Sequence, residues 1–189
     1  MLETLNSIDT ELFRWINGHH CTAMDWTMWT LSQHWSWAIV LVLAFGLLTL
    51  RHEPRRWWLV LVGIVLCFLL ADQASNLIKD TVCRLRPCWA LDDVVMFRTR
   101  KGGQYGFVSS HAANAFAIIT LLILRYRKRT WACILLSLWE LLTCYSRVYL
   151  GKHYPGDILG GALLGIIIGL IVWFLVTLIE KKLHKSETK

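Results

Sequence analysis

Charged and hydroxyl side chains that could carry out chemistry gather in three short stretches, each beside an apolar run of the sequence. The candidates are Lys79 and Arg86, then Ser109, Ser110 and His111, and finally Arg147, His153 and Asp157. The last group stands directly before an uncharged run, residues 158–179. Because charges beside a membrane-length segment are costly, we interpret these stretches as parts of a functional site.

The cations in these stretches predict a bound anion, because they outnumber the single carboxylate there. The planar guanidinium groups of Arg86 and Arg147 suit phosphate oxygens, and Lys79 adds a point charge. Ser109 and Ser110 stand where a helix is expected to begin, so their hydroxyls join the free amide groups and dipole that favour an anion. Phosphate is the ligand that this set of residues indicates.

Two histidines suit the two proton-dependent steps of phosphate cleavage. His153 lies four residues before Asp157, whose carboxylate is expected to orient one ring nitrogen and stabilise the imidazolium form. His111 has no carboxylate near it in the sequence and suits a general acid that protonates the leaving oxygen. The sequence contains no CxxC or Cys/His array, so we expect no metal and no other cofactor.

Simpler interpretations exist for several polar residues. Isolated histidines near a membrane surface are usually polar caps, and we interpret histidines 19, 20, 34, 52 and 184 in this way. Lys79 and Arg86, taken alone, would suit anchors that reach toward the headgroups. Asp72 and Glu140 suit hydrogen bonding within a bundle. The expected convergence of the three stretches on one membrane face favours the catalytic interpretation.

The composition favours an integral membrane protein. Of the 189 residues, 56% are hydrophobic and only 17% are charged, whereas soluble domains carry about 25% charged residues. The net charge of +7 comes from short loops and tails. Such residues usually set membrane topology or meet anionic lipid headgroups, so we expect a bilayer and no nucleic acid as the partner.

The apolar runs predict an all-α membrane bundle of about five transmembrane helices preceded by short interfacial helices. The expected spans are residues 35–50, 57–78, 109–124, 131–145 and 158–179. Residues 1–34 form the interfacial part, 35–181 the transmembrane domain and 182–189 a basic tail. Within the first interfacial helix, Ile8, Leu12, Trp15 and Ile16 fall on one face.

Five spans place the basic connections 51–56 and 125–129 and the C-terminal tail on one side. The positive-inside rule makes this side cytoplasmic. The loops 80–108 and 147–156 then share the opposite face with the N-terminus. The first of these loops is itself rich in Lys and Arg, which is unusual for an outer loop and is explained by an anion site.

Small residues suggest how parts of the bundle are held together. Gly161, Gly165 and Gly169 repeat every four residues and allow close helix approach, which we attribute to packing within the bundle in preference to dimerisation. The oligomeric state stays open. Cys83 and Cys88 share one loop, and the sequence leaves open whether they form a disulfide.

The three stretches together resemble the signature of the type-2 phosphatidic acid phosphatase superfamily, whose pocket is shared with vanadium haloperoxidases. The matching parts are Lys79-x6-Arg86-Pro87, Ser109-x-His111 and Ser146-Arg147-x5-His153-x3-Asp157. The resemblance covers about residues 60–180. The family usually reads Pro-Ser-Gly-His in the middle part, where this chain has Val108-Ser109-Ser110-His111. The departure affects amide geometry near phosphate but removes no catalytic side chain.

This resemblance implies that His153 attacks phosphorus, that Asp157 orients it and that His111 protonates the leaving group. It further implies that Lys79, Arg86, Ser109 and Arg147 hold the phosphoryl oxygens and stabilise the transition state. Water would then release phosphate from the phosphohistidine. The chain resembles compact bacterial members, which implies a multi-pass lipid phosphatase acting at the outer, periplasmic face of the inner membrane.

Several substrates and two other classes of protein stay open at this point. The substrates are undecaprenyl diphosphate, which we slightly prefer, phosphatidylglycerol phosphate, phosphatidic acid and lipid A phosphate. A haloperoxidase is disfavoured because those enzymes are soluble. A binder or carrier of lipid phosphate is suggested only by the altered middle part, and the intact His111, His153 and Asp157 argue against it.

Overall fold

The computed structural model describes residues 2–51 and 55–187, and this part of the chain is helical without a strand. The elements are α1 (Leu2–Asn17), α2 (Thr22–Leu31), α3 (His34–Ala44), the π-helical η1 (Phe45–Leu50), α4 (Trp57–Val82), α5 (Pro87–Ala90), α6 (Ser110–Arg125), α7 (Thr130–Tyr149) and α8 (Pro155–Glu187). The predicted all-α fold class is confirmed.

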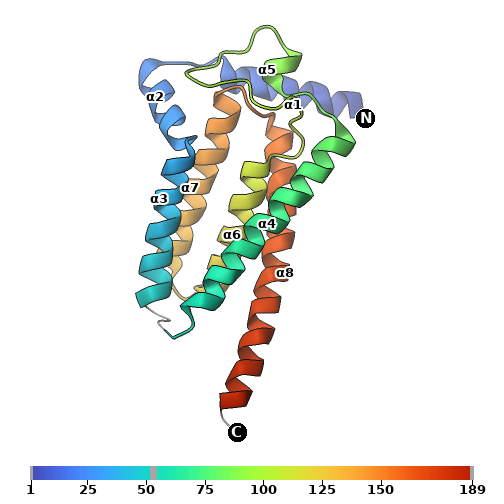
Figure 1. Cartoon of the computed structure of the whole chain (residues 1–189). Coiled ribbons are helices and arrows are strands. Elements are labelled where there is room, and N and C mark those ends of the chain that lie inside the picture. Colours follow the sequence, from blue (N-terminus) through green and yellow to red (C-terminus); the bar gives the residue numbers. More distant parts are fainter. Residues whose placement is uncertain (1, 52–54, 188–189) are drawn as a thin grey trace.

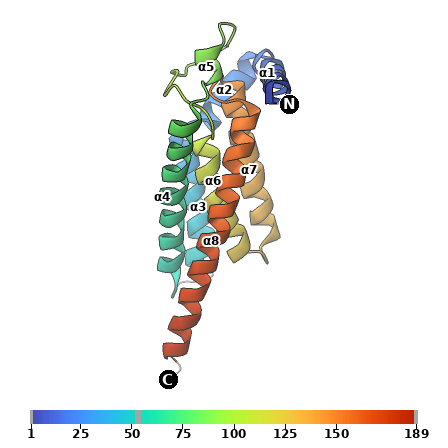
Figure 2. The same cartoon turned by 90° about the vertical axis from the view of Figure 1, so that its right-hand side faces the viewer.

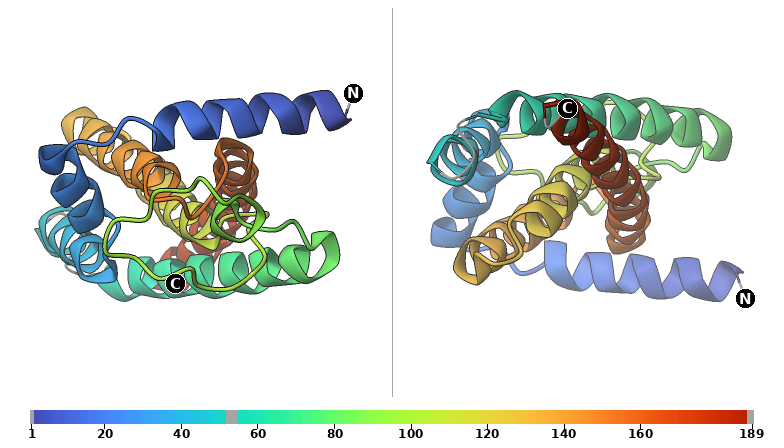
Figure 3. Two further views of the ribbon diagram at one scale, coloured as in Figure 1. Left: turned by 90° about the horizontal axis from the view of Figure 1, so that it is seen from above. Right: turned by 90° about the horizontal axis from the view of Figure 1, so that it is seen from below.

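The helix α6 is the centre of the bundle. Along the long axis of the bundle run α3, η1, α4, α6, α7 and α8, while α1 lies across one end (Figures 1 and 2). Viewed along that axis, α6 lies inside the ring made by its neighbours (Figure 3). It packs most closely against α8 and also contacts α4 and α7. Half of its residues are buried, and they are mainly alanine, isoleucine and leucine.

Glycines allow α6 and α8 to approach closely. A Cβ atom at Gly161, Gly165 or Gly169 would lie 2.4 to 2.5 Å from a backbone carbonyl oxygen of α6. No side chain larger than hydrogen fits at these separations without a shift of one backbone. The interpretation of these glycines as packing positions within the bundle is therefore confirmed.

The outer surface of the bundle is apolar, as a lipid-embedded protein requires. In the described residues, α4 and α8 are each long and apolar enough to cross a membrane. The segment of α2, α3 and η1 is bent by 59° and would count as a third span if it crossed as one unit. The expected number of about five spans is thus not established by length and composition. The shorter α6 is enclosed by other helices, so it does not need the length of a lipid-facing span.

Two helix ends lie further along the chain than the sequence predicted. The second expected span, 57–78, continues to Val82 as α4, and the fourth, 131–145, continues to Tyr149 as α7. Lys79 and Arg147 consequently lie in the last turns of these helices and not in loops. Cations are favourable there because the helix dipole is negative at the C-terminal end.

The amphipathic helix α1 rests on the end of the bundle with two different faces. Ile8, Leu12 and Trp15 are exposed, Trp15 to 64%, as suits an interfacial helix. Ile16, expected on the same face, is instead buried, with an exposed fraction of 9%. It packs beside Phe13 in a cluster that includes tyrosines from α7 and the turn before α8. The bundle therefore covers α1 at Ile16, which the shared helical face predicted from the sequence did not address.

Basic residues gather at the opposite end of the bundle, where α4 begins and α6 ends (Figure 1). Arg56 donates to Glu180 of α8 at 3.1 Å, and Arg125 pairs with the same carboxylate at 2.9 Å. The basic segments thus share one end, as predicted. Residues 52–54 of the first segment lie outside the described residues, and the tail predicted from 182 is helical up to residue 187.

We predict that Gly165→Ala destabilises the bundle by about 1–3 kcal/mol, because the added methyl group would overpack the α6–α8 contact. Thermal unfolding in detergent micelles should show a lower Tm. Gly46→Ala is the matched control, since no atom lies within 4 Å of the Cβ it would add. Equal Tm values for the two variants would contradict the packing account.

Candidate active site

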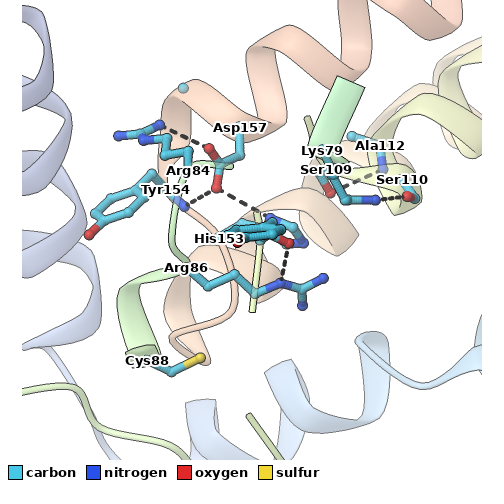
Figure 4. Close-up of polar contacts among 12 residues, drawn as sticks. Lys79, Arg84, Arg86, Cys88, Ser109, Ser110, Ala112, His153, Tyr154 and Asp157 are labelled. Atoms are coloured by element: carbon cyan, nitrogen blue, oxygen red, sulfur yellow. Dashed lines mark hydrogen bonds and ion pairs between the residues drawn. The ribbon is translucent and has the colours of Figure 1, made fainter. Parts of the chain in front are cut away.

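The three polar stretches meet at the end of the bundle covered by α1 and α5. Lys79 comes from the last turn of α4, Arg86 from the residue before α5, and His111 from the first turn of α6. Arg147 lies in the last turn of α7, and His153 lies in the turn between α7 and α8. Figure 4 shows Lys79, Arg86 and His153 in this region, with His153 directed toward Asp157 and Lys79 toward Ser110. The predicted convergence is therefore present in the structure.

Asp157 is fully buried and holds the ring of His153 (Figure 4). Its Oδ2 lies 3.3 Å from Nδ1 of His153 and accepts the amide of Tyr154 at 3.0 Å. Its Oδ1 accepts from Nη1 of Arg84 at 2.9 Å. Because a carboxylate oxygen accepts, the proton of the imidazole belongs on Nδ1 and the lone pair on Nε2.

The environment keeps His153 neutral near pH 7. The pKa of His153 is lowered to about 4, chiefly by burial and also by the charges of Arg86 and Arg147. The hydrogen bond with Asp157 acts in the opposite direction. A neutral imidazole with one oriented nitrogen can act as a nucleophile. The same electrostatic interactions show that both arginines lie close to this ring.

Two arginines of the site have N–H donors that no described residue accepts. Arg86 donates through Nε to the carbonyl of Tyr105 at 3.0 Å, and no described residue binds its terminal nitrogens. Arg147 is buried and donates through Nη1 to Ser32, while its Nε has no partner in the part of the chain described. Unused guanidinium donors beside a buried histidine suit the oxygens of an anion.

The start of α6 is tied to both neighbouring stretches. Ser109 is fully buried; its Oγ accepts the amide of Ala112 at 3.5 Å, and its own amide donates to the carbonyl of Asp157 at 3.0 Å. Ser110 accepts from Nζ of Lys79 and lies 2.7 Å from the hydroxyl of Ser75. The hydroxyl that replaces the family's glycine thus holds the lysine ammonium.

His111 lies between the cations and a cavity. It interacts electrostatically with Arg147 and His153, and its ring lies 4.9 Å from the ring of His34. A cavity of about 230 Å³ opens beside it. His34, expected as an isolated interfacial cap, is therefore a neighbour of the site, because α3 leads directly past the start of α6.

Residues 56–180 match the family model described as the PAP2 superfamily. The chain belongs to the PAP2 superfamily. It is a membrane lipid phosphatase, a phosphoric monoester hydrolase, as the resemblance implied.

Among similar PAP2 proteins is the lipid A 4′-phosphatase of Bacteroides thetaiotaomicron, which is 34% identical over 98% of this chain and 84% of its own length. The undecaprenyl-diphosphatase BcrC of Bacillus subtilis is 28% identical over 85% of this chain and 80% of its own. The crystal structure of Aquifex aeolicus LpxE superposes with a TM-score of 0.64 at 26% identity, covering 86% of this chain and 93% of that one.

Arg84 and Asp9 were not predicted as parts of this PAP2 site. Arg84 donates to Asp9 of α1 at 2.6 Å as well as to Asp157, and its guanidinium lies 4.2 Å from the ring centre of Tyr154. Asp9 also accepts the amide of Gly156 at 2.7 Å, at the beginning of α8. The partners are more than 70 residues apart in the sequence, so no local pattern reveals them.

Lys152 is a further cation that the sequence analysis missed, although it directly precedes His153. Burial lowers its pKa to about 8, and the charges of Arg147 and Arg86 act in the same direction. Its position directly before His153, the expected nucleophile, is the sequence feature that could have identified Lys152 as part of the site.

Cys83 and Cys88 are free thiols in the structure. The sulfur of Cys83 contacts the carbonyl of Asp80, and that of Cys88 contacts the carbonyl of Lys101. The disulfide that the sequence left open is not formed here.

We predict that Arg84→Ala lowers kcat by up to ~10²-fold with little change in KM, because the nucleophile loses its alignment. Asp9→Asn should give a smaller loss in the same direction. Both are measured as phosphate release from a lipid phosphate. Asp93→Asn is the control, since Asp93 pairs with Arg14 at the surface, where an ion pair contributes little. A loss in the control equal to that of Asp9→Asn would contradict this role.

Proposed function

We propose that this PAP2 protein hydrolyses a lipid phosphomonoester or diphosphate through a phosphohistidine on His153. One observation supports the proposal most: a buried histidine is held at one nitrogen by Asp157, and the charges of Arg86 and Arg147, which have unused donors, act on the same ring. This combination supplies a nucleophile and an anion receptor in one place.

In the first step, Nε2 of His153 attacks phosphorus, and the bond from phosphorus to the lipid oxygen breaks. Lys79, Arg86 and Arg147 hold the phosphoryl oxygens, together with the donors of Ser109 and Ser110 at the start of α6. These fixed charges stabilise the negative charge that develops during transfer. The imidazolium that forms at His153 is stabilised by Asp157.

His111 gives its proton to the departing lipid oxygen, so a neutral alcohol leaves. The bound phosphate dianion favours the protonated form of His111 before this step. In the second step, water loses a proton to His111 and attacks phosphorus, which breaks the bond to His153. Phosphate is released, and the protons on both histidines return to their starting positions.

Among lipid phosphates, we place lipid A 4′-phosphate first and undecaprenyl diphosphate second. The relative named for lipid A is 34% identical over nearly the whole chain, against 28% for the relative named for undecaprenyl diphosphate. This order reverses the slight preference taken from the sequence. Phosphatidic acid and phosphatidylglycerol phosphate remain further members of the substrate panel.

The active site is proposed to face the periplasm from the inner membrane. The basic residues near Arg56 and Arg125 lie at the other end of the bundle, and the positive-inside rule makes that end cytoplasmic. The excess of cations at the site end then reflects anion binding and not topology.

The purified protein in detergent should release phosphate from at least one member of the four-lipid panel named above. His153→Ala should lower this release by at least ~10³-fold, because the attacking nitrogen is lost. His19→Ala is the control, since His19 is exposed and its ring contacts Trp15 of α1. Phosphate release by His153→Ala at the wild-type rate, or none from any lipid by the wild type, would overturn the proposal.

A further inference from the structure

The cavity beside His111 lies where the leaving group must go. It is lined by His34 and Trp37 of α3, Phe68 and Asp72 of α4, and Ser110, His111 and Asn114 of α6. Because the proposed general acid forms part of its wall, the oxygen that departs from phosphorus must face this space. The volume of about 230 Å³ is suited to one ring-sized polar group.

Two polar side chains of this cavity have unused hydrogen-bonding capacity. Oδ1 of Asn114 is buried and has no partner among residues 2–51 and 55–187. Asp72 accepts from Asn76 through Oδ2 at 3.1 Å, and no described group donates to its Oδ1. A buried acceptor without a partner, as at Asn114, is costly, and Asp72 is half-buried at the same cavity wall. Together they indicate a ligand that donates hydrogen bonds.

We propose that Asp72 and Asn114 form a subsite for a neutral leaving alcohol that bears further hydroxyl or amide groups, as a sugar does. This inference rests on the proposed function and names its substrate class. A hydroxyl of the alcohol donates to Asp72, and another donor meets Oδ1 of Asn114. Asn114 stands three residues after His111 on α6, so both side chains face the same side of the helix.

The charge of Asp72 discriminates between two kinds of lipid phosphate. When a phosphomonoester is cleaved, the group that leaves into the cavity is an uncharged alcohol. When a diphosphate is cleaved, the leaving group is itself a phosphate anion, which the carboxylate of Asp72 repels. The subsite therefore favours a sugar phosphomonoester over a polyprenyl diphosphate.

The apolar part of the wall fits the same ligand and its lipid attachment. Trp37 and Phe68 offer aromatic faces for the C–H surface of a sugar ring. Phe68 is 47% exposed on the outer surface of α4, so the cavity borders the region occupied by lipid. Acyl chains on the sugar can thus remain in the bilayer while the phosphate reaches His153.

The test compares Asp72→Asn with the wild type on lipid A, undecaprenyl diphosphate and p-nitrophenyl phosphate. We expect kcat/KM for lipid A to fall by about 10-fold or more, as for the loss of a charged hydrogen-bond partner. The value for undecaprenyl diphosphate should rise or stay unchanged, because the repulsion is removed. Unchanged turnover of p-nitrophenyl phosphate shows that the variant is folded. Asn114→Leu should lower only the value for lipid A.

Asp80→Asn is the matched control, because it removes the same charge from an exposed position of the same helix, outside the cavity. An equal change of kcat/KM for all substrates in Asp72→Asn would overturn the subsite. A wild type that cleaves undecaprenyl diphosphate but not lipid A would also overturn it and leave the phosphatase mechanism standing. A wild type that cleaves none of the substrates would instead overturn the proposed function.

Discussion

A carboxylate with no access to solvent is costly unless opposite charges and hydrogen bonds compensate it. Asp157 is compensated in this way, and its contacts join the segment before α5, the turn before α8 and the start of α6. Its two oxygens accept from Arg84, from the amide of Tyr154 and from His153. Its backbone carbonyl accepts the amide of Ser109 at the start of α6. The helix α1 takes part through Asp9, which holds Arg84. An interfacial helix therefore contributes to the orientation of a histidine in the core.

Packing and chemistry depend on the same helix pair. The glycines of α8 let α6 approach to backbone distance, and this brings the start of α6 next to the start of α8. Ser109 and His111 thereby come close to His153 without any loop that reaches across the bundle. The helix α6 begins below the ends of its neighbours (Figure 1), and its first residues, Ser110 and His111, line the cavity there.

Much of this site could be predicted from the sequence because its residues lie at helix ends, where spacing and membrane topology determine which face they share. The contacts that no pattern revealed are long-range, such as Arg84 with Asp9 and His34 with His111. The burial of Ile16 could not be predicted, because helical periodicity gives the faces of a helix but not which one the bundle covers. The number of spans could not be derived from apolar length, since a helix enclosed by other helices, such as α6, does not need the length of a lipid-facing span.

The central claim is that His153 forms a covalent bond to phosphorus. It is tested by mixing the protein with lipid A labelled with ³²P, stopping the reaction within a turnover in alkaline detergent, and mapping the label by mass spectrometry. The account predicts an alkali-stable, acid-labile phosphoryl group on His153 that is absent from His153→Ala. Label on another residue, or turnover without any labelled protein in the rapid quench, would contradict it.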